Sequence, residues 1–350
     1  METATAGRLI DWGSAARIGS RFAGGGPHIS PQDRARLDED FGEVVAEADQ
    51  EVSAFTGLSL QGPGTRPWVM SRGEWVTQNL RGFQGVLEPV ARRVLGKRLE
   101  GTMAPVRRSL LAFQVGGILG YLGRKVLGQY DLFVPPDDRE LLYFVGPNVV
   151  EVERQFRFPR RDFRLWLALH EVTHRLQFEG VAWLRGYLFE LVDEYLATLE
   201  FDPRKLMDGL RRALEEARQS GRWREMGVLF LLMTPEQRET FQRMQALMSL
   251  LEGHGNFVMD TLAEGRVRGA GRMRRKLKER RQRGMNRTFQ RAVGLDVKVR
   301  QYDIGERFVA RAAARAGMEG FSKVWSRREN LPTLAEIGQP DLWVERVALG

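Results

Sequence analysis

The stretch that decides the fold is RDFRLWLALHEVTHRLQF, which spans residues 161–178. Apolar residues recur through it at helical spacing and leave one narrow polar strip, which holds His170, Glu171 and His174. On a helix the two histidines stand one turn apart on the same face. A pair of imidazoles at that spacing can share one tetrahedral metal ion, most often zinc. We therefore predict a mostly buried helix that carries two metal ligands.

Glu171 occupies a different position on this predicted helix. It lies about 100° around the axis from His170, so it can reach a water at the metal without being a ligand. The simpler interpretation is a pair of core histidines that bond to neighbouring groups, with Glu171 on a wet edge. Polar side chains on an apolar helix cost free energy unless something satisfies them, and a metal does so. We predict His170 and His174 as ligands and Glu171 as the general base.

The third ligand must come from another part of the chain. A catalytic zinc ion needs three protein ligands and keeps a fourth position open. The chain has no cysteine, so the third ligand is His, Glu or Asp. Our first candidate is Glu252, which follows two apolar turns of a predicted helix, where a carboxylate needs a partner. Asn256 lies one turn later and can orient it, while Gly253 and Gly255 permit close packing against the metal helix.

Two other residues stay open as the third ligand. Glu194 lies twenty residues after His174 on the next predicted helix, a spacing that suits many zinc hydrolases. It stands among other acidic residues, however, as on a solvated face. His254 is the second alternative, and on a helix it points away from Glu252, which makes joint ligation awkward.

The remaining chain predicts a mainly α protein with a small β-sheet (α+β). The run Leu141–Val145 is short and β-rich, and we expect it to be an edge strand beside the metal helix. Residues 149–154 alternate like a second strand, and residues 62–67 are rich in turn formers. The sequence TPEQ at residues 234–237 predicts a helix start with a capping box. We find no repeat, linker or boundary and expect one domain over residues 1–350.

Positive charge is concentrated in one segment. The net charge is +9, and residues 266–287 hold eleven Arg or Lys and one acid, so the other residues together are near −1. Such density suits phosphate contacts, but the segment has no aromatic side chain on which bases could stack. A solvated, arginine-rich helix, or a flap over the active-site cleft, would explain the charge of this segment equally well. A nucleic-acid partner is therefore the less favoured interpretation of this segment.

The most apolar stretch covers residues 109–123, fifteen residues flanked by Arg and Lys. A membrane-spanning helix needs about 20 apolar residues, so we expect a buried helix and no membrane partner. Gly116 and Gly120 lie four residues apart and allow another backbone to approach closely. The N-terminal residues show no secretory signal and the chain lacks cysteine, which indicates a cytoplasmic protein.

Six motifs are spread over the chain: LYFVGPN at 142–148, LWLALHEVTH at 165–174, LLEGH at 250–254, GLDVK at 294–298, QY at 301–302 and LPTLAE at 331–336. Together they resemble a family of zincin-like metallopeptidases (HExxH) of actinobacteria and related bacteria, some of them associated with biosynthesis of the deazaflavin coenzyme. The resemblance covers nearly the whole chain. It implies a zincin-like metal helix packed beside a short edge strand, with His170, His174 and Glu252 on zinc and Glu171 as the base. Where zincins with a glutamate ligand have an acid four residues after it, this chain has Asn256.

These observations predict a zinc hydrolase, most simply a metallopeptidase-like enzyme. Zinc polarises a water and the scissile carbonyl, and Glu171 passes the proton of the water to the leaving amine. We expect the strand Leu141–Val145 to pair with an extended peptide or small amide substrate along its free edge. An oxyanion stabiliser is also required, and Lys298, Arg300 and Tyr302 are candidates by residue type alone.

Two other functions stay open at this point. In the first, the zinc ion is structural and the protein is a catalytically silent accessory of a cofactor pathway. In the second, the protein is a binding module whose residues 266–287 contact nucleic acid or another polyanion.

Overall fold

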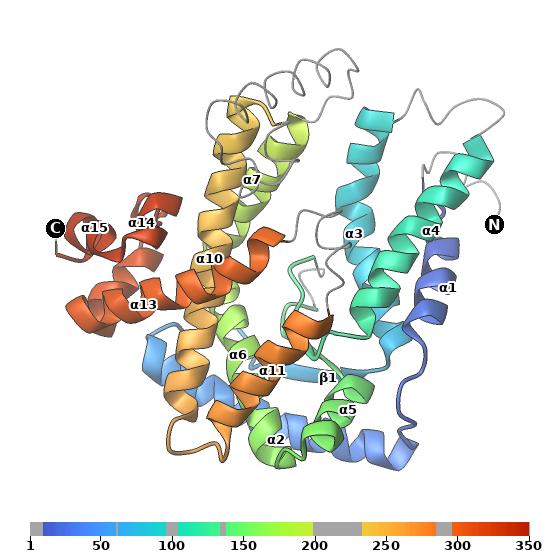
Figure 1. Cartoon of the computed structure of the whole chain (residues 1–350), viewed down its shortest axis with the longest axis horizontal. Coiled ribbons are helices and arrows are strands. Elements are labelled where there is room, and N and C mark those ends of the chain that lie inside the picture. Colours follow the sequence, from blue (N-terminus) through green and yellow to red (C-terminus); the bar gives the residue numbers. More distant parts are fainter. Residues whose placement is uncertain are drawn as a thin grey trace. The chain divides into compact units, whose positions relative to one another are not determined.

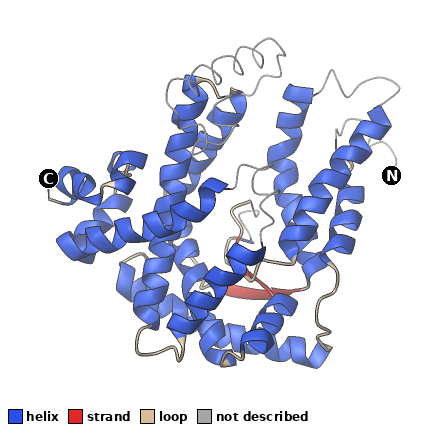
Figure 2. Cartoon of the chain, in the orientation of Figure 1, coloured by secondary structure: helices blue, strands red, loops and turns tan. Residues whose placement is uncertain are grey.

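The computed structural model describes residues 10–60, 62–95, 104–133, 138–198, 233–284 and 296–349. Helices dominate it, and the strands form one small sheet (Figures 1 and 2), so the prediction of a mainly α protein with a small β-sheet is confirmed. The strands are β1 (Arg66–Met70), β2 (Gly128–Tyr130) and β3 (Leu141–Val145). The helices are α1 (Trp12–Ala23), α2 (Pro31–Thr56), α3 (Arg72–Leu95), α4 (Ala104–Gly123), α5 (Gly146–Phe156), α6 (Arg160–Gly180), α7 (Leu184–Ala197), α10 (Pro235–Ala263), α11 (Ala270–Gly284), α13 (Asp296–Ser322), α14 (Leu334–Gly338) and α15 (Pro340–Trp343).

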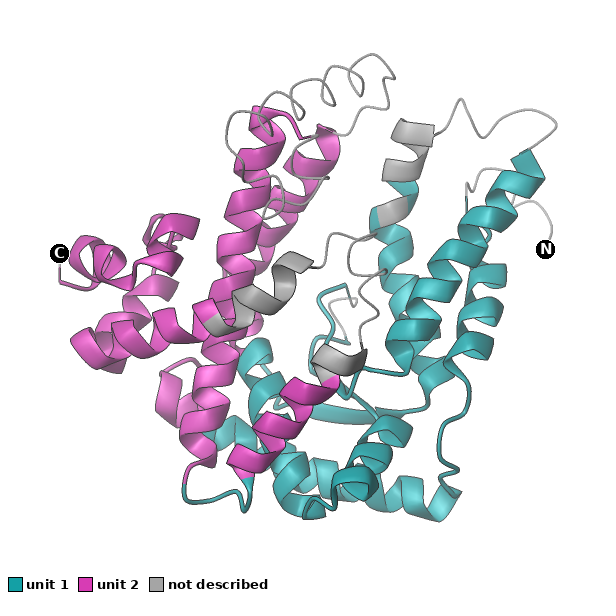
Figure 3. Ribbon diagram, viewed as in Figure 1, with its two compact units in different colours: residues 1–51, 60–175, 265–269 teal, residues 52–59, 176–264, 270–350 magenta. Residues whose placement is uncertain are grey.

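The chain divides into two compact units (Figure 3). Unit 1 comprises residues 1–51, 60–175 and 265–269, and unit 2 comprises residues 52–59, 176–264 and 270–350. Unit 1 contains the sheet and most of α6, whereas unit 2 contains α7, α10 and the C-terminal helices. The expectation of a single domain over residues 1–350 stays a prediction.

The sheet of unit 1 has the strand order β1-β3-β2. The central strand is β3, which pairs with β1 in parallel and with β2 antiparallel, and all five of its residues are buried. The prediction that Leu141–Val145 is an edge strand was therefore wrong. Its continuous apolar run is the pattern of a strand covered on both faces, and such a strand belongs in the middle of a sheet.

Two further expectations about this region were wrong. Residues 149–154 belong to α5 and not to a strand, because Pro147 stands in the first turn of the helix, where its fixed φ favours helix initiation. The turn expected over residues 62–67 ends early, since β1 begins at Arg66. The first error arose because short apolar runs fit a helix and a strand equally well. The second arose because the glycine and proline residues of this stretch are typical of turns.

The hydrogen-bond pattern of the edge strand β2 shows which of its backbone N–H and C=O groups point toward β3 and which point away from it. The amide of Val145 donates to the carbonyl of Leu127 at 2.9 Å, so these two residues form a hydrogen-bonded antiparallel pair. Gly128 lies opposite Phe144, one position further, where the pair exchanges no hydrogen bonds. The N–H and C=O of Gly128 therefore point away from β3, toward the edge that no described strand occupies.

Helices α1 and α4 of unit 1 touch through their backbones. A Cβ atom added at Gly116 would lie 2.5 Å from the carbonyl oxygen of Ala15, and one at Gly120 would lie 2.5 Å from that of Gly19. The predicted close approach at these two glycines is confirmed. The expectation of a buried helix was wrong for one face of α4, where Phe113 is 52% exposed. In the described part of the chain, no helix combines the length and the apolar character that crossing a membrane requires.

Helix α10 of unit 2 begins with the predicted capping box, in which Thr234 and Gln237 each cap the other's backbone amide. It then crosses α13 at two glycines. A Cβ atom at Gly253 would lie 2.2 Å from the carbonyl carbon of Gly305, and one at Gly305 would lie 2.0 Å from the carbonyl oxygen of Ser249. Gly253 thus permits close packing against α13, not against the metal helix as the sequence suggested.

Replacement of Gly305 by Ala is expected to lower the free energy of unfolding by about 3 kcal/mol, the upper end of the usual cost of overpacking, because the added methyl group meets backbone that cannot rotate away. Urea unfolding followed by circular dichroism measures the change. Gly186 on α7 is the matched control, since nothing lies within 4 Å of a Cβ placed there. Gly186→Ala should gain roughly 0.5–1 kcal/mol from helix propensity. Equal unfolding midpoints for the two variants would contradict the tight crossing.

Residues 270–284 of the basic segment form helix α11. Met273 and Leu277 are buried one turn apart, and Arg274 pairs with Asp260 and Glu306 at 2.5 Å each. This is the pattern of an amphipathic helix packed on its own unit, with its polar face in water. It fits the solvated helix that the sequence analysis offered as the simpler account of the charge.

Candidate metal centre

The first half of α6 is fixed in unit 1 by a buried ion-pair network. The guanidinium of Arg164 donates to both carboxylate oxygens of Glu153 on α5, at 2.8 and 3.0 Å, and to Asp40 on α2. Burial raises the pKa of the Glu153 carboxyl, and the neighbouring Arg164 opposes that rise. A two-pronged contact of this kind fixes direction as well as distance, so it sets the rotation of α6 about its axis.

A second arginine holds the same helix directly after the histidine motif. Arg175 is 3% exposed, and its three nitrogens donate to the carbonyl of Arg139 at 3.1 Å, the hydroxyl of Thr65 at 2.6 Å and the carbonyl of Pro63 at 2.9 Å. These acceptors precede β3 and β1. Arg175 thus ties the histidine-bearing turn to the start of both parallel strands.

His170 and His174 point to the same place. Their Nε2 atoms are 3.2 Å apart and their rings are nearly perpendicular, at 84°. A hydrogen bond between the two rings would give this distance. It is also close to the separation of about 3.4 Å between two ligand nitrogens on one tetrahedral zinc ion with bonds near 2.1 Å.

Glu171 lies on the face of the edge strand β2. It is 8% exposed, and a Cβ atom at Gly128 would lie 2.8 Å from its Cγ and 3.0 Å from its Oε1. The missing side chain of Gly128 therefore leaves the space that this carboxylate occupies. Strand β2 is held in turn by Gln129, which accepts from the indole of Trp75 at 2.7 Å and donates to Asn79 at 3.0 Å.

In unit 2, the last turn of α6 contacts α10 around the candidate third ligand. The side-chain amide of Gln177 lies 3.1 Å from the carbonyl oxygen of Leu251 and 2.9 Å from Nδ1 of His254. These two residues flank Glu252 in sequence. Because Gln177 follows His174 by less than one turn, its contacts fix the segment of α10 that presents Glu252.

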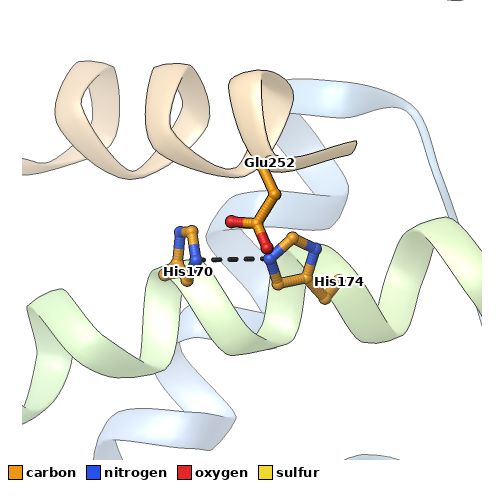
Figure 4. A group of neighbouring side chains, drawn as sticks. All are labelled: His170, His174 and Glu252. Atoms are coloured by element: carbon orange, nitrogen blue, oxygen red, sulfur yellow. Dashed lines mark hydrogen bonds between the residues drawn. The ribbon is translucent and has the colours of Figure 1, made fainter. Parts of the chain in front are cut away.

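His170, His174 and Glu252 form one group of possible metal ligands (Figure 4). Each offers one ligand atom, and these atoms lie within 4.8 Å of one another. Figure 4 shows the carboxylate of Glu252 reaching from α10 toward the two imidazoles on α6. Two imidazole nitrogens and one carboxylate oxygen are the ligand types of catalytic zinc sites, and three ligands leave the fourth position open. The donor set therefore fits zinc.

The structure separates the other two candidates for the third ligand from this group. Glu194 on α7 pairs with Arg243 of α10 at a half-exposed position. His254 is fully buried, and its ring stacks on Phe321 at 5.4 Å between centroids and meets the edge of Trp325 at 5.3 Å. The identity of the third ligand stays a prediction, with Glu252 as the residue that the geometry favours.

Three residues of this region were not predicted from the sequence: Gly128, Arg175 and Gln177. Gly128 carries no pattern of its own, because a strand of three residues is too short to show a period. Arg175 and Gln177 do follow the motif closely, and buried polar residues on an apolar helix are a usable signal for such roles. The side chains of Lys298, Arg300 and Tyr302, named as oxyanion candidates, lie outside the described residues.

Two comparisons with known proteins agree with this geometry. A family model described as zincin-like metallopeptidase matches residues 10–344. The crystal structure of a "putative hydrolase with a novel fold" from Chloroflexus aurantiacus is similar, with a TM-score of 0.74 and 32% sequence identity over 96% of this chain and 98% of that one. No curated protein matches the chain. Together the matches support a hydrolase.

Proposed function

Because the chain belongs to the zincin-like metallopeptidase family, we propose that it is a zinc-dependent hydrolase of peptide or small amide bonds. The observation that carries this proposal is the convergence of one ligand atom each from His170, His174 and Glu252. The position of Glu171 beside the edge strand supports it further. The cytoplasmic location and the link to deazaflavin coenzyme biosynthesis stay predictions from the sequence.

Three residues would hold the metal, and a fourth would move the proton. His170, His174 and Glu252 would bind zinc, which when bound supplies a Lewis acid that polarises the scissile carbonyl and makes water more acidic. Glu171 accepts the proton of the attacking water at its carboxylate and donates it to the nitrogen of the leaving amine. Its nearly complete burial against Gly128 keeps the carboxylate in one orientation.

The substrate strand would pair with β2 and not with β3. The N–H and C=O of Gly128 point to the edge beyond β2, and Glu171 lies over the same residue. An extended peptide that adds to this edge makes main-chain hydrogen bonds next to the general base. Such pairing recognises backbone first, so the enzyme should accept extended peptides before compact amides.

Zinc-dependent turnover of a peptide library tests the proposal. The full-length protein is freed of metal with a chelator, dialysed, and assayed with and without one equivalent of zinc, with mass spectrometry of the products. We expect cleavage only in the zinc-loaded sample. Zinc bound at one equivalent without any cleavage would overturn the hydrolase and leave a silent metal protein. Equal cleavage in both samples would overturn the metal requirement.

Gly128→Ala is expected to lower kcat/KM for such a peptide by roughly tenfold to a hundredfold, because the new methyl group displaces the Glu171 carboxylate from its place. The zinc content and the unfolding midpoint should stay near those of the wild type, since alanine suits a strand better than glycine. Gly85→Ala on α3 is the control, because nothing lies within 4 Å of a Cβ there. Wild-type activity in Gly128→Ala would contradict the placement of the base.

A further inference from the structure

The exposed face of α4 forms the edge of a patch on unit 1 that the proposed hydrolysis does not use. Among the described residues, seven large apolar side chains are exposed, and five of them lie on α1 and α4. Four of these five lie together, Phe22, Val106, Leu110 and Phe113, and we call them the apolar stripe, whereas the fifth, Ile118, lies further around α4. The other two, Leu342 and Leu349, lie near the C-terminus of the chain.

The stripe runs along the first half of α4 and extends onto α1. Val106, Leu110 and Phe113 follow one another at the spacing of one helix face. The ring of Phe22 meets that of Phe113 edge-on at 5.8 Å, so α1 widens the patch. Half-exposed side chains of this size each leave on the order of 100 Å² of apolar surface in water. The four together reach the few hundred Å² above which an exposed patch marks an interaction site.

A basic rim accompanies the stripe. Residues 11–23 and 104–125 hold six Arg or Lys and a single acid, Asp11, so these two segments carry a net charge of +5. The basic residues are Arg17, Arg21, Arg107, Arg108, Arg124 and Lys125. The ammonium of Lys125 lies 5.8 Å above the ring of Tyr121, which places it at the last turn of α4. Residues 266–287 hold the larger share of the positive charge, and this rim is a second, smaller concentration of it.

We propose that the apolar stripe and its basic rim dock unit 1 peripherally on an anionic lipid surface. Large apolar side chains enter the boundary between headgroups and acyl chains, while arginine and lysine meet the anionic headgroups. A second copy bound through the same stripe would bring two basic rims together, and their repulsion opposes that pairing. The sequence argument against a membrane concerned a helix that spans it, whereas this contact lies on the surface.

Vesicle flotation of the full-length protein tests the proposal. We use phosphatidylcholine vesicles with about 30% phosphatidylserine, and vesicles of phosphatidylcholine alone. The wild type should float with the anionic vesicles, bind more weakly at high salt, and stay behind with the neutral ones. Replacing both Leu110 and Phe113 by Ser should reduce the partition coefficient by more than about tenfold. Leu342→Ser with Leu349→Ser is the matched control for exposure and should bind as the wild type does.

A fluorescent reporter keeps the test independent of a damaged fold. The chain has no cysteine, so Leu110→Cys introduces a unique attachment point for an environment-sensitive dye, and Leu342→Cys gives the control. We expect an intensity gain and a blue shift with anionic vesicles at position 110 only.

Three results would overturn the proposal. The first is a wild type that does not bind the anionic vesicles. The second is binding that survives Leu110→Ser with Phe113→Ser but is lost when Arg272 and Arg275 of α11 become Gln, which would assign it to the basic helix. The third is a dimer by light scattering that the Leu110 and Phe113 changes dissociate, which would make the stripe an interface between copies.

Discussion

Glu252→Ala is expected to reduce bound zinc from about one ion per chain to near zero, because a site with two histidines alone lacks the third ligand of a zinc centre. Loss of a residue that only supports a ligand already costs about 10–100-fold in affinity, so loss of the ligand itself should exceed that range. Elemental mass spectrometry of the purified protein measures zinc content, and competition with a fluorescent chelator measures affinity.

Glu194→Ala is the control for this experiment. The two glutamates are the alternatives that the sequence left open, and Glu194 is occupied by an ion pair with Arg243. Its removal should leave zinc content unchanged and cost at most about 1 kcal/mol in stability, as exposed pairs do. Loss of zinc in Glu194→Ala together with full zinc in Glu252→Ala would refute the assigned site.

Glu171→Gln should lower kcat by roughly 10²–10⁴-fold while zinc content stays at the wild-type level, because the amide keeps the shape of the carboxylate but cannot accept the proton. Steady-state kinetics on a peptide substrate gives the change. KM should move little, since Glu171 acts on the water and not on the bound peptide. Glu179→Gln, on the last turn of the same helix, should hydrolyse the peptide at the normal rate. Unchanged turnover in Glu171→Gln would exclude Glu171 as the base.

The parts of the fold that the sequence predicts well are those with a long periodic signal. Helix α6 repeats its apolar residues from Phe163 to Phe178, and a capping box marks the start of α10, so both helices could be predicted from the sequence. Strand β2 could not be found in this way, because three residues show no period. The exposure of one face of α4 was not predicted, because an apolar composition indicates that a helix favours burial but does not show which of its faces another element covers.

The residues of the candidate site also differ in how far the sequence predicts them. His170, Glu171 and His174 are set by local spacing on one helix, which a sequence displays directly. Glu252 required an argument about burial, and that argument could not choose between it and two rivals. Gly128 belongs to the site only because another part of the chain packs against it, and contacts of that kind are decided by tertiary structure.

The backbone N–H and C=O groups of β2 point alternately toward β3 and away from it. This alternation limits how many residues can be inserted in the segment that precedes the strand. If a single residue were inserted between Lys125 and Gly128, the strand would either move along β3 by one position or reverse which of its residues face outward. In both cases a residue with a side chain would replace glycine over the Glu171 carboxylate. Insertions of two residues restore which backbone groups face outward, but they also move Gly128 away from this carboxylate. Related proteins should therefore keep the length of this segment unchanged.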